Sequence, residues 1–142
     1  WKHAIKLIEE KYGPFENFIS IPPTSPLRID KDLFDIMNSL KSEIDLVLGI
    51  TRSKRNPYFN MVTNEGRVKI LIDSNKTFRR QDAPLVYDIT TVAYAAKVSY
   101  VKNTNTILEG NIKGVEIPEE RSIDIDNHFD LNIARLLFSS KD

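Results

Sequence analysis

The fold is decided by the stretch Leu46-Val47-Leu48-Gly49-Ile50, a continuous apolar run in the middle of the chain. A short apolar run of this kind is typical of a buried strand. Residues 31–41 precede it and carry apolar side chains at helical spacing, with Asp30 as a suitable N-cap. Earlier still, Phe18-Ile19-Ser20-Ile21 predicts another buried strand. Strands separated by helices favour an α/β fold with a mostly parallel sheet and helices on its faces.

Working outward, the same alternation continues with one interruption. Further helices are predicted over residues 2–11, 99–103 and 128–139, and further strands over residues 91–96 and 115–117. Strands over residues 58–63 and 67–73 flank the turn signal Asn64-Glu65-Gly66, which predicts a β-hairpin. Because the hairpin interrupts the alternation of strand and helix, we expect residues 54–78 to form a protruding arm. A polar loop is predicted over residues 74–84.

Length and composition limit the number of domains and the classes of partner. The 142 residues fit one domain, residues 1–142, and the 20 basic residues balance the 20 acidic ones. The chain therefore has no net positive charge that would attract nucleic acid or a membrane surface, and we expect neither as a partner. The absence of cysteine excludes disulfides and thiolate chemistry and agrees with a cytoplasmic location. The chain opens on a helix rather than a strand, so we expect the domain to be incomplete at its N-terminus.

Two carboxylates, Asp124 and Asp126, stand at alternate positions directly before the predicted final helix. Alternate residues of an extended segment project from one face. Such a pair suits Mg²⁺, which takes one or two protein carboxylates and completes its shell with water and substrate phosphates. The alternative is that Asp126 caps the helix and Asp124 is an ordinary surface residue. Arg121 just before them could equally be a structural ion-pair partner.

Two further segments carry arginine: Arg79-Arg80-Gln81-Asp82 and Pro23-Thr24-Ser25-Pro26-Leu27-Arg28. Arginine binds carboxylate or phosphate through two parallel hydrogen bonds, so both segments are candidates for the anionic parts of a substrate. The proline-rich segment follows a predicted strand, and ligands of open α/β sheets bind beyond the carboxyl ends of strands. The alternatives are a solvated charged loop for the first segment and a rigid connector for the second.

The content and order of these segments resemble the CMP-sialic acid synthetases, or acylneuraminate cytidylyltransferases. Residues 23–28 are similar to that family's Gln-Pro-Thr-Ser-Pro-Leu-Arg segment, and residues 80–87 to its Arg-Gln-Asp-Leu-Pro-x-x-Tyr segment. Residues 120–126, followed by Asp130 and Ala134, are similar to its C-terminal signature. The family's first strand and its basic phosphate-binding loop have no counterpart in residues 1–142, and we expect them upstream.

The resemblance implies a Rossmann-like nucleotidyltransferase sheet flanked by helices and a homodimer built partly by the hairpin arm. It implies Mg²⁺-dependent transfer of CMP from CTP to the anomeric hydroxyl of an acidic nine-carbon sugar, with release of pyrophosphate. Asp124 and Asp126 would hold the metal, and Arg80 would be catalytic with them. The implied substrate-binding residues are Thr24, Ser25, Arg28, Arg79, Arg80, Gln81, Tyr87 and Thr90.

Two departures from the family pattern leave alternatives open. Pro22 stands where the family has Gln, which removes a polar side chain from the nucleotide side. Thr90-Thr91 replaces Asn-Gly, and the added Cβ and branching change the expected sugar pocket. A legionaminic- or pseudaminic-type sugar, or another acidic sugar such as 3-deoxy-manno-octulosonate, is an alternative substrate. A non-catalytic fragment or pseudoenzyme, acting as a dimerising or acidic-sugar-binding module, is the alternative of another class.

Overall fold

The computed structural model describes residues 1–73 and 79–139 of the chain. These residues belong to two compact units. The first, here the sheet unit, comprises Trp1–Thr51 and Ile89–Asp142, and the second, the hairpin unit, comprises Arg52–Asp88. None of the helices within the described ranges is long and apolar enough to cross a bilayer.

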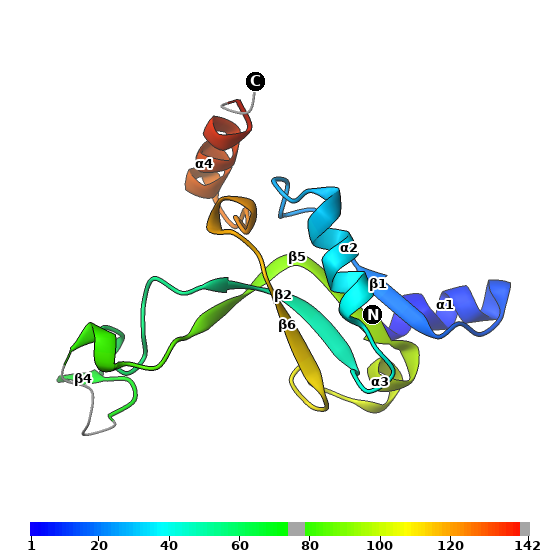
Figure 1. Ribbon diagram of the computed structural model, residues 1–142, viewed down its shortest axis with the longest axis horizontal. Coiled ribbons are helices and arrows are strands. Elements are labelled where there is room, and N and C mark those ends of the chain that lie inside the picture. The colour runs from blue at the N-terminus through cyan, green and yellow to red at the C-terminus, as the bar shows by residue number, and fades with distance from the viewer. Residues whose placement is uncertain (74–78, 140–142) are drawn as a thin grey trace. The chain divides into compact units, whose positions relative to one another are not determined.

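A four-stranded mixed sheet forms the centre of the sheet unit, in the order β1-β5-β2-β6 (Figure 1). The strands are β1 (Asn17–Ser20), β5 (Tyr87–Lys97), β2 (Leu46–Arg52) and β6 (Ile112–Glu116). β2 and β6 are parallel, whereas β1 and β5 are antiparallel. The N–H of Lys97 donates to the carbonyl of Asp45, and that of Ser53 to the carbonyl of Val86, so β5 is also antiparallel to β2.

The expectation of a mostly parallel sheet is therefore wrong in its pairing, because only the β2–β6 ladder is parallel. A parallel neighbour needs a crossover that carries the chain back along the sheet, usually through a helix. The chain between β2 and β5 makes no such crossover, since its ends are joined by the Ser53–Val86 hydrogen bond. The chain consequently returns antiparallel beside β2, although the α/β character predicted from the alternation is confirmed.

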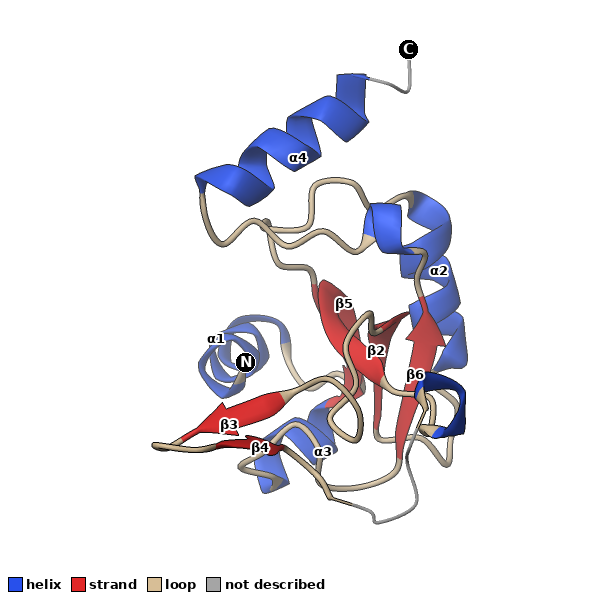
Figure 2. Ribbon diagram, turned by 90° about the vertical axis from the view of Figure 1, so that its left-hand side faces the viewer, coloured by secondary structure: helices blue, strands red, loops and turns tan. Residues whose placement is uncertain are grey.

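Helices cover both faces of the sheet (Figure 2). They are α1 (Lys2–Tyr12) and α3 (Val98–Asn103) on one face and α2 (Asp30–Ser39) on the other. Along β2, Leu46 and Leu48 join Ile5 of α1 in one core cluster, while Val47 joins Ile36 of α2 in the second. This follows from the alternation of side chains along a strand, and it explains why the run that decides the fold is apolar throughout.

The start of α2 differs from the predicted cap. Asp30 is the first residue of the helix rather than its N-cap, which is Ile29. The N–H of Ile29 donates to Oδ2 of Asp32 at 3.0 Å. The carboxylate at the third helical position thus accepts the N–H of the N-cap residue, as in a capping box.

The hairpin unit contains the predicted β-hairpin, with shorter strands than expected. β3 (Val62–Asn64) and β4 (Val68–Ile70) pair antiparallel, and Gly66 in the turn has a φ of +80°. Residues 74–78, at the end of the predicted arm and the start of the predicted polar loop, lie outside the described residues. The role of residues 54–78 as a dimerisation arm, and the assignment of residues 1–142 to one domain, stay predictions.

Gly49 of β2 gives a test of packing across the sheet. A Cβ added there would lie 2.5 Å from Oγ1 of Thr90 and 3.2 Å from Cγ1 of Ile117. We expect Gly49→Ala to lower the free energy of unfolding by about 1–3 kcal/mol, the usual cost of overpacking, when measured by urea denaturation. Adding Thr90→Ala removes the nearer atom and should restore part of the loss. A Gly49→Ala variant as stable as its parent would contradict this close approach.

Candidate active site at the carboxyl edge of the sheet

Three segments of the sheet unit meet at one edge of the sheet. Residues 21–29 follow β1, residues 117–127 follow β6, and residues 90–92 belong to the first half of β5. Because β5 is antiparallel to β1 and β2, its first residues lie at the carboxyl ends of those strands. The N–H of Ile125 donates to the carbonyl of Thr24 at 2.9 Å. This bond joins the segment of Asp124 and Asp126 to the proline-rich loop.

The proline-rich loop is fastened to β5 by two of the predicted substrate-binding residues. Oγ of Ser25, which is fully buried, lies 2.6 Å from Oγ1 of Thr91. The guanidinium of Arg28 donates to the carbonyl of Val92 at 2.8 Å and to that of Pro22 at 2.6 Å. Both side chains therefore hold the loop in place, and burial lowers the pKa of Arg28. Their contact with a substrate stays a prediction.

An ion pair between the half-buried Arg121 and the buried Asp32 ties the segment after β6 to helix α2. Nε of Arg121 lies 3.0 and 3.2 Å from the two carboxylate oxygens of Asp32, and its NH2 lies 2.9 Å from Oδ1. Asp32 is only 2% exposed. The hydrogen bonds with Asp32 raise the pKa of Arg121, although burial opposes the rise. The structural interpretation of Arg121 is confirmed, but its partner was missed, because nothing in the sequence connects residues so far apart.

Asp124 has a carboxylate oxygen that none of the described residues satisfies. Its Oδ1 is buried and has no hydrogen-bond partner among the described residues. Burial raises the pKa of Tyr94, and the negative charge of Asp124 raises it further, so the two side chains share one environment. A buried carboxylate oxygen without a donor is costly unless a cation or water meets it. The interpretation of Asp124 as an ordinary surface residue does not account for this oxygen.

Among the described residues, the capping of α4 (His128–Ser139) does not use the carboxylate of Asp126. Oδ1 of Asn127 accepts the N–H groups of Phe129 at 2.8 Å and Asp130 at 3.2 Å, so Asn127 is the cap. Oδ2 of Asp130 accepts the N–H groups of Asp126 and Asn127, each at 3.1 Å. The alternative in which Asp126 caps the helix is therefore wrong, and Asp126 is exposed.

Asp124 and Asp126 fit a magnesium ion in chemistry and number. Within residues 1–73 and 79–139, no cluster of three or more His, Cys, Asp or Glu side chains could hold a metal. Mg²⁺ does not need such a cluster, because one or two carboxylates together with water and substrate phosphates complete its shell. The unsatisfied oxygen of Asp124 and the exposed carboxylate of Asp126 meet this requirement. Magnesium binding itself stays a proposal.

The second arginine segment lies in the hairpin unit, in a short 3-10 helix, η1 (Arg80–Asp82). Arg79 pairs with Asp82 through Nε at 3.1 Å and NH2 at 3.4 Å. NH2 of Arg80 makes a long hydrogen bond of 3.4 Å to the carbonyl of Lys54. Arg79, Arg80, Gln81 and Tyr87 are all exposed. These side chains are accessible to a ligand, and their contact with a substrate stays a prediction.

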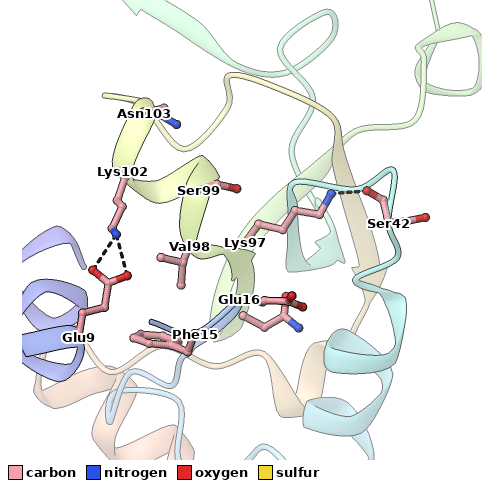
Figure 3. A pocket seen from close by; sticks show the side chains of 10 residues that line it. Glu9, Phe15, Glu16, Ser42, Lys97, Val98, Ser99, Lys102 and Asn103 are labelled. Carbon is pink, nitrogen blue, oxygen red and sulfur yellow. Dashed lines mark hydrogen bonds and ion pairs between the residues drawn. The ribbon is translucent and has the colours of Figure 1, made fainter. Parts of the chain in front are cut away.

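A cavity of about 630 Å³ lies at the other end of β5, beside α1 and α3 (Figure 3). Its lysines are already engaged: Nζ of Lys102 lies 2.6 Å from Oε2 of Glu9, and Lys97 donates to the carbonyl of Ser42. None of the predicted site residues lines it. Because Lys97 ends β5 and Thr90 lies near its start, this cavity belongs to the opposite edge of the sheet, and we assign no substrate to it.

The fold of the chain is similar to that of a solved enzyme structure. A solved structure, 4-diphosphocytidyl-2C-methyl-D-erythritol synthase from Anaerococcus prevotii, matches with a TM-score of 0.62 and 14% sequence identity. The match covers 96% of this chain and 64% of that one. At this identity the likeness defines the fold, and the substrate has to be argued from the site.

Curated relatives are similar to the chain in sequence. Post-translational flagellin modification protein B of Campylobacter coli is 23% identical over 89% of this chain and 54% of its own length. CMP-N,N'-diacetyllegionaminic acid synthase of Campylobacter jejuni is 29% identical over 63% of this chain and 38% of its own. N-acylneuraminate cytidylyltransferase of Streptococcus agalactiae is 25% identical over 84% and 29%, respectively.

These relatives confirm the resemblance to the CMP-sialic acid synthetases that the three motifs indicated. No protein-family model matches the chain. The chain spans about half the length, 54%, of the flagellin modification protein and smaller shares of the other two relatives. The activity of the whole protein is therefore argued below as a proposal.

The ionisation of Tyr94 provides a test of its proximity to Asp124. Burial and a nearby negative charge both favour the neutral phenol, so the folded pKa lies above the ordinary value of about 10. The stability that this preference provides is fully present below pH ~10 and is lost as the pH rises through the folded pKa. We expect Asp124→Asn to move the titration of Tyr94 to lower pH.

The titration is followed by ultraviolet absorbance, and the difference from a Tyr94→Phe variant isolates Tyr94 from the other tyrosines. Asp35→Asn, which removes an exposed carboxylate on α2, is the control and should leave the titration unchanged. If Asp124→Asn also leaves it unchanged, the electrostatic contact between Asp124 and Tyr94 is refuted.

Proposed function

We propose that the protein containing this chain is a cytidylyltransferase for a sialic-acid-like nonulosonic acid. It transfers CMP from CTP to the anomeric hydroxyl of the sugar and releases pyrophosphate. The observation that carries the proposal is the meeting of Asp124 and Asp126 with the proline-rich loop at the carboxyl edge of a nucleotidyltransferase sheet. The relatives named for the synthesis of CMP-legionaminic acid and for acylneuraminate cytidylyl transfer support the same reaction class.

Asp124 and Asp126 would hold Mg²⁺ beside the triphosphate. The bound metal supplies charge neutralisation and polarisation of the phosphoryl oxygens. The anomeric oxygen of the sugar forms a bond to the α-phosphorus, the bond to the bridging oxygen of pyrophosphate breaks, and the hydroxyl proton is released. The contribution of the protein is positioning and electrostatic stabilisation, as in other phosphoryl transfers. Ser25 and Arg28 contribute by fixing the loop that borders the site.

The carboxylate of the sugar has a candidate partner in the Arg79-Arg80-Gln81 segment. Arg79 is engaged with Asp82, whereas Arg80 makes one long bond to a backbone carbonyl among the described residues. A guanidinium with donors to spare is suited to a carboxylate, which it binds through two parallel hydrogen bonds. We therefore assign Arg80 to the acidic group of the sugar, with Gln81 beside it and Tyr87 nearby in sequence, across the interface of a homodimer.

Thr90 is the second polar group that favours a ligand at this edge. Its side chain is only 4% exposed, and Oγ1 has no hydrogen-bond partner among the described residues. A buried hydroxyl without a partner suits contact with a polar substrate. Because Thr90 and Thr91 replace the Asn-Gly of the family, this part of the pocket should set which sugar is accepted. A legionaminic-type acid is the principal alternative to sialic acid.

The metal role is tested with Asp124→Asn and Asp126→Asn in the complete protein. We expect Mg²⁺-dependent release of pyrophosphate from CTP and sugar to fall at least about a hundredfold in each variant, because the metal supplies several kcal/mol of stabilisation to the transition state. Asp35→Asn is the matched control and should retain the parental rate. Unchanged turnover in both site variants would refute the metal role.

The sugar contact is tested with Arg80→Lys, which keeps the charge but loses the paired donors of the guanidinium. We expect the KM for the sugar to rise about tenfold while the KM for CTP stays the same, since only binding of the sugar carboxylate is affected. Arg55→Lys, an exposed arginine of the hairpin unit outside the motif, is the control. Assays with sialic, legionaminic and 3-deoxy-manno-octulosonic acids identify the preferred sugar. A rise in the KM for CTP alone would contradict the assignment.

A further inference from the structure

The ion pair of Arg121 and Asp32 stands directly before the segment that carries Asp124 and Asp126. We propose that this pair is a positioning device that holds the two metal-binding carboxylates at the carboxyl edge of the sheet. The inference rests on the proposed function, since it takes Asp124 and Asp126 to be magnesium ligands. Neither Arg121 nor Asp32 contacts the metal or the substrate in this proposal.

Asp32 is unusually well placed to act as a fixed anchor. Its Oδ2 accepts the N–H of Ile29 at 3.0 Å and Nε of Arg121, also at 3.0 Å. One buried carboxylate thus closes the start of α2 and receives the guanidinium through two donors. A planar guanidinium held in this way has little freedom to rotate. The position of Arg121 is therefore set by helix α2 and by the core behind it.

The backbone on both sides of Asp124 is also fixed. On one side, Arg121 ends a 3-10 turn, η2 (Glu119–Arg121), closed by hydrogen bonds from Arg121 to Pro118 at 3.0 Å and from Ser122 to Glu119 at 3.1 Å. On the other side, the N–H of Ile125 donates to the carbonyl of Thr24. Only Ser122 and Ile123 separate Arg121 from Asp124, so the anchor acts over a very short length of chain.

The segment needs such anchors because it belongs to no helix or strand. Residues 122–125 have no regular secondary structure, so no ladder of hydrogen bonds fixes their conformation. A metal site also requires its carboxylates at a set separation, and groups that support the ligands commonly change metal affinity 10–100-fold. A purely structural explanation of the pair is weaker, since buried ion pairs often add little net stability over apolar side chains of similar size.

The decisive variant replaces the pair without leaving a buried charge unpaired. Asp32→Asn combined with Arg121→Met keeps an acceptor for the N–H of Ile29 and replaces the guanidinium with an unbranched, uncharged side chain. The control, Asp35→Asn with Lys31→Met, makes the corresponding changes, acid to amide and cation to methionine, in the exposed pair of α2. Thermal unfolding establishes that both double variants are folded.

The readouts are binding of Mn²⁺ to the complete protein in the presence of CTP, followed by electron paramagnetic resonance, and the Mg²⁺ concentration that half-activates pyrophosphate release. We expect the Asp32/Arg121 variant to bind Mn²⁺ about tenfold more weakly and to need correspondingly more Mg²⁺. The control variant should match the parent in both. Arg121→Lys, which restores the charge with a single donor group, should lie between parent and double variant.

The outcomes separate this inference from the proposed function. If Asp124→Asn leaves Mn²⁺ binding intact, the metal role in the proposed function fails. If Asp124→Asn abolishes binding while the folded Asp32/Arg121 variant binds like the parent, the positioning role is overturned and the proposed function stands. Should the double variant unfold, Arg121→Lys decides: metal affinity equal to that of the parent overturns the inference, and weakened affinity in a folded protein supports it.

Discussion

The antiparallel insertion of β5 between β1 and β2 is the constraint on which the rest of the sheet unit depends. It brings the first residues of β5 to the edge where β1 and β2 end. Only there can Ser25 meet Thr91 and Arg28 meet the carbonyl of Val92. The proline-rich loop is thereby held against the sheet, and the segment after β6 is bonded to that loop. The parts of the site come from three separate stretches of chain. The direction of β5 brings these stretches together at one edge of the sheet.

The polar groups of this edge divide into two kinds. Most are satisfied within the protein, as in the pair of Arg121 and Asp32, and these groups give the edge its shape. Oδ1 of Asp124 and Oγ1 of Thr90 are buried without a partner among the described residues, which is an unfavourable state for the free protein. A folded chain tolerates such groups where a ligand meets them. The contrast between satisfied and unsatisfied groups distinguishes the supporting residues from the candidate binding residues.

Sequence reasoning succeeded where a signal was local and repeated. The helix over residues 128–139 and the strand beginning at Leu46 were predicted from periodicity and apolar character, and both are observed. The direction of β5 was not accessible, because it depends on the return path of the chain between strands. The cap of α4 is Asn127 rather than Asp126, because neighbouring Asp and Asn side chains have similar intrinsic preferences and only backbone geometry selects between them. The cap of α2 was misplaced because Ile29, the N-cap, has no capping side chain, and its N–H is satisfied instead by Asp32. The role of Asp32 was missed because its partner is brought to it by tertiary folding.

The hydrogen bond from Ile125 to Thr24 has a thermodynamic consequence. It makes the acidic segment and the proline-rich loop one mechanical unit, so displacement of either is transmitted to the other. Ligands that order the two parts are then energetically coupled. By linkage, each ligand changes the binding affinity of the other by the same factor. Under the proposed function, cation and nucleotide binding would therefore be cooperative, with the cooperativity carried by the backbone rather than by any side chain that touches both.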